Sequence, residues 1–245
     1  MQISLAPLPH TEIGLIFAMP TEANGVVDKM SNRRTIKGKK FRFHYGSFAG
    51  CGIAVVESGI GRANAAEAAN VLYENFRPEK IILAGYSGSL SKACSRNAII
   101  VPQRFVLKND GKTIEIRNKF NEQPTSMTLL TSDEIVRTAN DKHELNQNFG
   151  AEIVDMESYA VVEYCNEKGI PLAVIRIVFD EVDEDMSEEV TRIVDTDNST
   201  SKMLGTLVGS LFRKPKLALE LYKLKEHALI ATDKLAKKIE EMIKQ

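Results

Sequence analysis

The sequence has few cysteines, and their spacing matches neither a metal site nor a disulfide framework. Its 245 residues include three, Cys51, Cys94 and Cys165, which are odd in number and far apart. There is no CxxC pair or Cys/His cluster, which is the spacing that a structural zinc site requires. We therefore expect all three to be reduced and buried as small apolar side chains.

The chain also lacks an excess of charge and a long apolar run. It has 32 Lys and Arg against 33 Asp and Glu, so it lacks the long-range positive field of a nucleic-acid-binding protein. No apolar run approaches the ~18 residues that a membrane span needs. Residues 1–12 have no basic segment before an apolar run, unlike a signal peptide. These absences favour a small-molecule substrate and a cytoplasmic location.

Apolar runs that alternate with helical segments predict the fold class. Strands are expected at Ile13–Met19, Phe41–Ser47, Gly52–Ser58, Ile81–Ala84, Ala98–Val101, Thr128–Ser132 and Leu172–Phe179. Helices are expected after Pro20, over Ala63–Phe76 and Met156–Lys168, and from Lys216 onward. This order predicts a three-layer α/β/α fold with a central mixed sheet.

Two further segments bear on the domain organisation. Residues Lys108–Pro124 are polar and contain an evident turn at Asn109–Lys112, which predicts a short hairpin or excursion rather than a second domain. The apolar residues after Lys216 recur at helical spacing, and such faces normally pack inward. We expect this C-terminal helix to cover the core of a single domain that comprises residues 1–245.

Polar or glycine-rich residues follow several expected strands, at the edge where open α/β sheets bind ligands. They are Glu22, Ser58–Arg62, Gly85–Gly88, Asp133 and Asp180. Taken alone, Glu22 also fits a solvated carboxylate at a helix start, and the glycines also fit turns that need a positive φ. The pattern as a whole predicts a ligand site at one rim of the sheet.

Two ionisable residues of the last apolar run are unusual. Asp180 ends the run, and apolar surroundings would raise the pKa of its carboxyl group and suit a general acid. It also begins the acidic stretch Asp180–Asp185, which fits a solvated loop. Arg176 lies inside the run, and a buried guanidinium needs a carboxylate or a ligand as partner. A structural salt bridge would satisfy it equally well.

Four blocks together resemble the purine nucleoside phosphorylase and uridine phosphorylase superfamily, and within it the 5′-methylthioadenosine/S-adenosylhomocysteine nucleosidases. They are IGLIFAMPTEA from Ile13, VVESGIGRANAA from Val55, IILAGYSGSL from Ile81, and VDMESYAVVEYC with VIRIVFDEV between Val154 and Val182. The last is the most specific, because an M-E-x-x-A block followed by an R-x-x-x-D strand end is unusual in other α/β proteins. The resemblance covers most of residues 13–185.

The resemblance implies a role for each matching residue. Asp180 resembles the general acid that protonates or hydrogen-bonds the imidazole nitrogen of the leaving purine. Glu22 resembles the carboxylate that orients and deprotonates the attacking water, with Arg176 nearby. Glu157, with the backbone of Met156, resembles the clamp on the ribose 2′- and 3′-hydroxyls. Such a reaction follows the logic of inverting glycoside hydrolysis and needs no metal or cofactor.

The remaining residues of the implied site hold the base, and two of them depart from the family pattern. Ile135 and Val136 align with the apolar pair that flanks the purine. The glycine-rich stretch contains Tyr86, followed by Ser87 and Gly88, and places a phenol where the family often has a small hydroxyl near the water site. Phe179 replaces the small residue before the catalytic aspartate and adds an aromatic ring beside the purine pocket.

The segment Val106–Met127 is shorter than in typical nucleosidases, which use it in the dimer interface and over the 5′ end of the nucleoside. A more open 5′ pocket follows, one that would admit a bulkier 5′ substituent. Members of the family usually form homodimers through this segment. Because the segment is shorter here, it gives less support to a prediction of a homodimer.

The resemblance predicts hydrolysis of the N-glycosidic bond of a purine nucleoside, such as 5′-methylthioadenosine or S-adenosylhomocysteine. A carboxylate at Glu22 would repel phosphate, which favours hydrolysis over phosphorolysis. Two alternatives stay open: a phosphate-dependent phosphorylase of the same fold, and a catalytically silent nucleoside-binding protein.

Overall fold

One mixed sheet runs through the molecule. The computed structural model describes residues 9–120, 125–186 and 215–245, with side chains from 223 onward in the last range. The strands are β1 (Ile13–Phe17), β2 (Ser31–Lys37), β3 (Arg42–Phe48), β4 (Cys51–Glu57), β5 (Lys80–Ser89), β6 (Ile99–Ile100), β7 (Arg104–Leu107), β8 (Thr113–Glu115), β9 (Thr128–Thr131), β10 (Ile153–Asp155) and β11 (Leu172–Asp180). Their order is β2-β3-β4-β1-β5-β10-β9-β7-β8, and β11 pairs with β5 and β6.

Strand β5 is the centre of the sheet. Its first part lies between β1 and β11, and both pairings are parallel. Its last residues pair with β10 in the antiparallel direction. Because β1, β5 and β11 point the same way, their carboxyl ends meet at one edge, as the sequence predicted for the ligand site.

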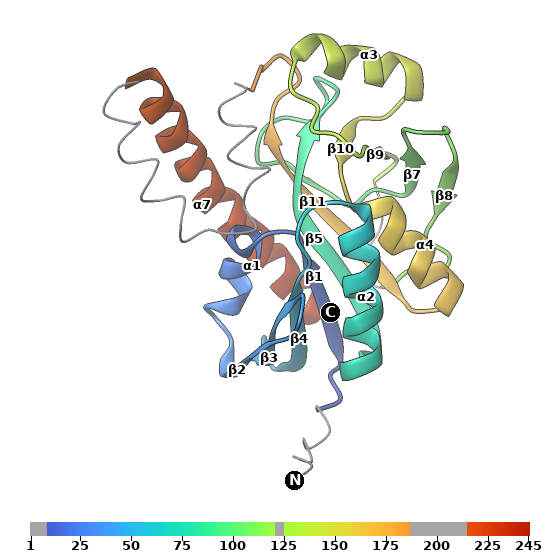
Figure 1. Ribbon diagram of the computed structural model, residues 1–245, viewed down its shortest axis with the longest axis vertical. Helices are drawn as coiled ribbons and strands as arrows, with labels where there is room; N and C mark the ends of the chain where they lie inside the picture. The colour runs from blue at the N-terminus through green and yellow to red at the C-terminus, as the bar shows by residue number, and fades with distance from the viewer. Residues whose placement is uncertain (1–8, 121–124, 187–214) are drawn as a thin grey trace.

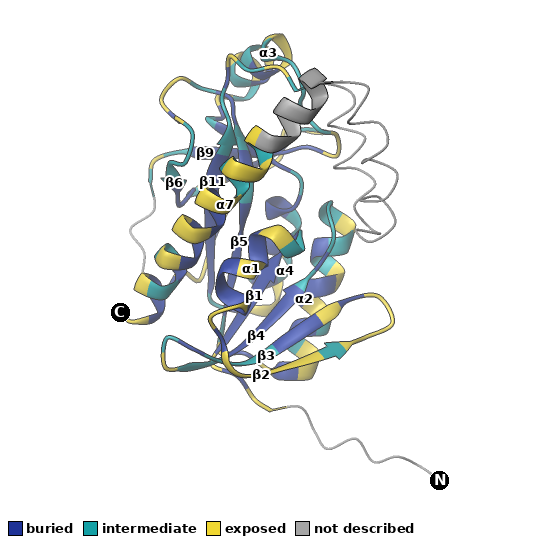
Figure 2. Ribbon diagram, turned by 90° about the vertical axis from the view of Figure 1, so that its left-hand side faces the viewer, coloured by how far each residue is buried: buried dark blue, intermediate teal, exposed yellow. Residues whose placement is uncertain are grey.

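Helices cover both faces of the sheet, which confirms the three-layer fold (Figure 1). Helices α2 (Arg62–Phe76) and α4 (Ser158–Lys168) pack on each other over one face, and α1 (Pro20–Val27) packs on α7 (Pro215–Ile243) over the other. A separate buried cluster lies under each pair, and Figure 2 shows the buried inner faces of the helices. Helix α3 (Ala139–Phe149) lies beyond the strand ends.

The two segments that bear on domain organisation fold largely as expected. Strands β7 and β8 form an antiparallel hairpin around the predicted turn, although the first strand begins at Arg104. Residues 121–124 of this segment lie outside the described residues. In α7 the side chains of Leu235, Ile239 and Met242 are fully buried, so this helix covers the core as predicted. Among the described residues, no helix combines the length and apolar character needed to cross a membrane.

Some local predictions are wrong. Helix α4 begins at Ser158 rather than Met156, because the Asp155 carboxylate accepts the Ser158 backbone N–H at 3.0 Å and ends the preceding strand there. The exposed strand β2, strand β10 and helix α3 were not predicted from the sequence. Cys94 and Cys165 are buried as expected, but Cys51 is only partly buried.

Candidate active site

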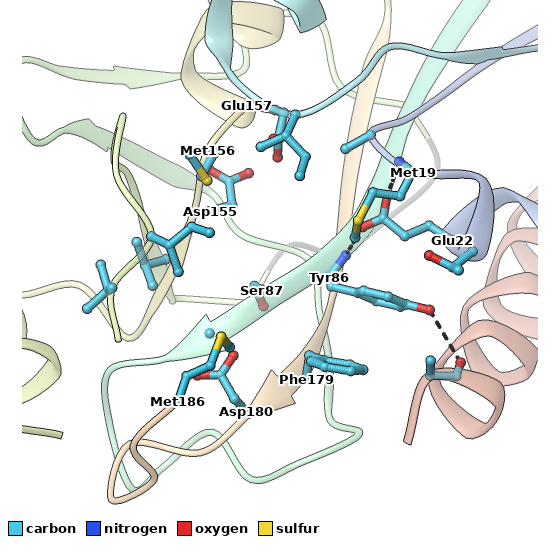
Figure 3. A pocket seen from close by; sticks show the side chains of 18 of the residues that line it. Met19, Glu22, Tyr86, Ser87, Asp155, Met156, Glu157, Phe179, Asp180 and Met186 are labelled. Carbon is cyan, nitrogen blue, oxygen red and sulfur yellow. Dashed lines mark hydrogen bonds between the residues drawn. The ribbon is translucent and has the colours of Figure 1, made fainter. Parts of the chain in front are cut away.

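A pocket of about 400 Å³ opens at the carboxyl ends of β1, β5 and β11. Figure 3 shows the side chains that converge on it from these strands, from the start of α4 and from α7. Ten of the predicted site residues line it: Glu22, Tyr86, Ser87, Gly88, Ile135, Val136, Met156, Glu157, Phe179 and Asp180. Arg176 lies beneath the lining.

Glu22 lies in the first turn of α1 and is buried, with 3% of its surface exposed. Its Oε2 accepts the Met19 backbone N–H at 2.8 Å, and its Oε1 accepts the Tyr86 N–H at 2.7 Å. It therefore caps its helix while it faces the pocket, and the solvated alternative is wrong. Burial raises the pKa of this carboxyl, although the two N–H groups and Arg176 oppose that rise.

Arg176 has the carboxylate partner that its burial requires. Its Nη2 lies 2.5 Å from Asp155 Oδ2 and 3.5 Å from Glu157 Oε2, and it also donates to Ser158 Oγ at 3.0 Å. Arg176 and Asp155 side chains are each 1% exposed. The sequence reading did not identify Asp155 as the partner. A network of this kind fixes the geometry of its members, because each polar group has a bonding partner.

The Gly85 backbone lies directly over this network. A Cβ atom at this position would lie 2.5 Å from Arg176 Nη1 and 2.7 Å from Glu22 Oε1, which is too close for any real contact. The glycine is needed so that strand β5 can lie against the guanidinium and the Glu22 carboxylate, and not because of a turn.

Glu157 reaches across the pocket from the start of α4. Its Oε1 accepts the Gly61 backbone N–H at 2.9 Å, so its carboxylate joins α4 to the loop after β4. It does not cap its own helix, because Asp155 has that role. Burial raises the pKa of Glu157 to about 7, with Arg176 opposing and Asp155 adding to the rise. Met156 lies beside it in Figure 3.

Asp180 is held at the end of β11 by an irregularity in the sheet. The register shifts between Val178 and Asp180, so Phe179 is an extra residue that turns the Asp180 side chain into the pocket. Gly88 lies opposite, where an added Cβ would be 3.3 Å from both Asp180 oxygens. Burial raises the pKa of Asp180, as expected from its apolar surroundings, and Lys142 opposes the rise.

The partner of Asp180 is Lys142, which was not predicted from the sequence. Lys142 of α3 places its Nζ 2.5 Å from Asp180 Oδ2, and its side chain is 1% exposed. Its helix has few apolar residues, so periodicity gave no signal. The helix does have an N-cap, since Thr138 accepts the Asp141 N–H at 3.1 Å, and Gly150 ends it in the left-handed conformation. A threonine three residues before an acidic residue was the available signal.

Tyr86 and Phe179, the two departures from the family pattern, lie against each other. Their rings stack with centroids 4.8 Å apart and planes 17° apart. The Tyr86 hydroxyl is bonded to α7, where it lies 2.7 Å from Thr232 Oγ1 and donates to the Ala228 carbonyl oxygen at 3.3 Å. The ring of Tyr86 therefore lines the pocket beside Phe179, while its hydroxyl bonds α7.

The segment after β9 contributes apolar residues but not its aspartate. Ile135 and Val136 line the pocket as the sequence predicted. Asp133, which was expected at the same rim, instead forms a two-bond contact with Arg62, with both distances 2.6 Å. It is 42% exposed and is not among the residues that line the pocket. Its role is to tie this segment to the start of α2.

The sequence matches the model of a known family. It belongs to the phosphorylase superfamily, whose model matches residues 12–124 and 113–213. Among solved structures, the chain is similar to the 5′-methylthioadenosine/S-adenosylhomocysteine nucleosidase of Helicobacter pylori, with 18% identity, coverage of 97% of this chain and 99% of that one, and a TM-score of 0.71.

Two further structures share the fold. Futalosine hydrolase of Helicobacter pylori is 18% identical, with coverage of 95% of this chain and 97% of that one and a TM-score of 0.70. The nucleosidase of Colwellia psychrerythraea, in complex with adenine, is 19% identical, with coverage of 77% and 90% and a TM-score of 0.64. At such identities these similarities establish the fold.

Proposed function

We propose that this chain hydrolyses the N-glycosidic bond of a purine nucleoside and releases the free base. The observation that carries the proposal is the arrangement of two buried carboxyl groups, Glu157 and Glu22, and the partly buried Asp180 around one pocket in a superfamily that acts on nucleosides. Burial raises the pKa of all three, and such shifts at one cleft are typical of acid and base catalysts.

Asp180 acts at the base end of the pocket. Its carboxyl group, whose pKa is raised by burial, donates a proton to the imidazole nitrogen of the purine as the glycosidic bond breaks. Ile135 and Val136 also line the pocket and would flank the ring. The base then leaves as a neutral molecule, because the added proton offsets the electron pair that the base takes from the glycosidic bond.

Glu157 and Glu22 act on the sugar and the water. Glu157, positioned by the Gly61 N–H, accepts hydrogen bonds from the ribose hydroxyls, and these strengthen as the sugar gains positive charge. Glu22 is held by two backbone N–H groups and takes a proton from water as the water attacks the anomeric carbon. A raised pKa makes it a better base than an exposed glutamate.

The same residues argue against phosphorolysis. Of the described residues that line the pocket, Lys225 is the only cation, and it lies on α7 rather than beside Glu22. Glu22 would meet a phosphate with a second negative charge, and such a contact is unfavourable in a buried site. The guanidinium of Arg176 is already bonded to Asp155 and Ser158.

The end of the pocket toward α7 fits the 5′ substituent of the nucleoside. Met19, Leu224 and Ala228 line this end, and they offer an apolar surface to a thioether or alkyl group. We propose a 5′-substituted adenosine, such as 5′-methylthioadenosine or S-adenosylhomocysteine, as the substrate. The chain would act in the cytoplasm as a single domain, without metal or cofactor, and as a homodimer.

The test is base release from 5′-methylthioadenosine, S-adenosylhomocysteine, adenosine and inosine, each with and without phosphate. We expect release of adenine that does not depend on phosphate, together with a free sugar, and release by Asp180→Asn that is lower by about 10²- to 10⁴-fold. Release only with phosphate, with a sugar 1-phosphate as product, would identify a phosphorylase. Binding of a nucleoside without release of its base would identify a silent binding protein.

A further inference from the structure

Lys142 is a buried lysine whose three donors are all used within a few residues of the site. Its Nζ contacts Asp180 Oδ2 at 2.5 Å and donates to the carbonyl oxygens of Glu181 at 2.7 Å and Glu184 at 2.9 Å. An ammonium group has three protons, so this geometry leaves none unpaired. The charge is thus fixed in position, aimed at one oxygen of the carboxyl group that faces the base.

Burial of this charge is costly, and the loop it contacts has another anchor. Arg96 donates to the Phe179 carbonyl at 2.9 Å and forms an ion pair with Glu184. These contacts hold the same loop from the opposite side, so loop attachment alone does not require a lysine at 142. A buried ion pair is weak evidence for stability, because desolvation offsets the attraction between the charges. The distinctive feature of Lys142 is its contact with Asp180.

We propose that Lys142 is a positioning residue that aims the Asp180 carboxyl group at the purine and stabilises the negative charge left there when the base takes its proton. This inference rests on the proposed function. The inference adds to that function the residue that positions Asp180, the general acid.

The O–H bond of Asp180 breaks and an N–H bond forms on the imidazole ring, while the electron pair of the glycosidic bond passes to the base. Water forms a bond to the anomeric carbon and gives its proton to Glu22. The Asp180 carboxylate that remains lies against the Lys142 ammonium. Lys142 keeps its proton throughout.

Several charges face Asp180 and decide its titration. Lys142 from α3 and Arg96 from the β5–β6 connection favour the ionised form, while burial and Glu184 favour the protonated form. Arg96 also contacts His227 Nδ1 of α7 at 2.8 Å. Lys142 is the group in direct contact, and an opposite charge at this range lowers the pKa of a carboxyl by about 1 to 3 units.

The experiment compares Lys142→Met, which keeps the length of the side chain but removes the charge, with Lys142→Arg, which keeps the charge. We expect Lys142→Met to lower kcat by about tenfold or more, because a weaker acid transfers its proton less readily. The alkaline limb of its pH profile should move up by about 1 pH unit or more, because Asp180 stays protonated to higher pH. KM should change less than kcat, and Lys142→Arg should restore much of the loss.

Arg96→Met is the matched control, because it loosens the same loop and leaves the Lys142 contact in place. We expect it to change KM or thermal stability with a smaller movement of the alkaline limb than in Lys142→Met. If both variants leave that limb unmoved, Lys142 has only a structural role and the inference is wrong. Equal movement of the limb in the two variants would also overturn it.

A second variant and a second measurement complete the test. If Lys142→Met does not fold, Lys142→Gln removes the charge but retains N–H donors for the loop carbonyls. The measurement is the NMR titration of the Asp180 carboxyl carbon, which does not need turnover. We expect a higher pKa in the neutral variants than in the wild type; an unchanged pKa overturns the inference. If the neutral variants show this higher pKa of Asp180 but the wild type releases no base, the proposed function is wrong, whereas the contact of Lys142 with Asp180 is supported.

Discussion

Each of the two ends of the pocket holds a carboxyl group against a buried cation. The two ends differ in the part of the fold that supplies the cation. At the end that we propose holds the ribose, the cation is Arg176 of β11, and its partner Asp155 ends β10, so both belong to the central sheet. At the end that we propose holds the base, the cation is Lys142 of α3, and Asp180 follows an irregularity at the end of β11. We call these the ribose end and the base end.

The difference lies in how much of the fold each pair supports. The Arg176 network joins β10, β11 and α4, and two of its members are 1% exposed. The Asp180 side chain is 18% exposed, and its cation comes from a helix beyond the strand ends. Loss of the ribose-end cation should therefore damage the fold, whereas loss of the base-end acid should mainly damage the reaction.

The largest effect on the reaction is expected from Asp180→Asn. The amide cannot give up a proton, so base release should fall by about 10²- to 10⁴-fold, the usual contribution of a general acid. The unfolding transition should move little, since asparagine fills the same space and can still accept a bond from Lys142. Steady-state kinetics and thermal unfolding of the same sample check both statements. A large loss of stability would show that the two ends are alike.

The largest effect on stability is expected from Arg176→Met. Removal of the guanidinium leaves Asp155, Glu157 and Glu22 buried without their cation, and breaking a buried pair from one side costs about 3–5 kcal/mol. Urea denaturation followed by circular dichroism measures this change. As a control, Arg42→Met removes an exposed ion pair to Glu57, which should cost about 0–1 kcal/mol. Equal effects of the two variants would refute the importance of the network.

Glu157→Gln should alter the pH dependence of stability. The native state raises the pKa of Glu157 from its ordinary value of 4.5 to about 7, so it binds the proton more tightly than the unfolded chain. Its favourable contribution is present below pH 4.5 and is lost as the pH rises through about 7. Unfolding free energies of the wild type should fall across this window by up to about 3 kcal/mol more than those of the variant. Parallel curves would contradict the burial of this group.

The smallest effect is expected from Tyr86→Phe. It removes the hydroxyl that bonds Thr232 but keeps the ring stacked on Phe179. One hydrogen bond is worth about 1 kcal/mol, so the melting temperature should fall slightly. Base release should stay within about twofold of the wild type, because the lost hydrogen bond does not involve the reacting atoms. A loss comparable to that of Asp180→Asn would place the phenol in the chemistry after all.

One member of the ion pair at each end of the pocket could be predicted from the sequence. Arg176 was conspicuous because a charge interrupts an apolar run, and Asp180 because it ends that run. Lys142 was not, since its helix has no apolar stripe and an isolated lysine normally belongs to the surface. Its burial depends on where α3 crosses the loop after β11, and no local pattern encodes that crossing.

The same limit explains the other errors. Strand β10 is short and is defined by its pairing with β9 and β5 rather than by its own composition. Asp155 looked like one of several acidic residues before a helix, and only the sheet brings it to Arg176. The apolar parts of β1, β5 and β11 were predicted because each carries its own signal of burial, although β5 continues to Ser89 beyond the predicted end at Ala84.

The most direct test of the two-ended pocket is a crystal structure of Asp180→Asn with an unreacted 5′-substituted adenosine bound. We predict that the imidazole edge of the purine lies within hydrogen-bond distance of Asn at position 180, and that the ribose hydroxyls lie on Glu157. The 5′ group should point toward Leu224 and Ala228 of α7. A nucleoside bound with its sugar at position 180, or outside this pocket, would contradict the assignment of the two ends.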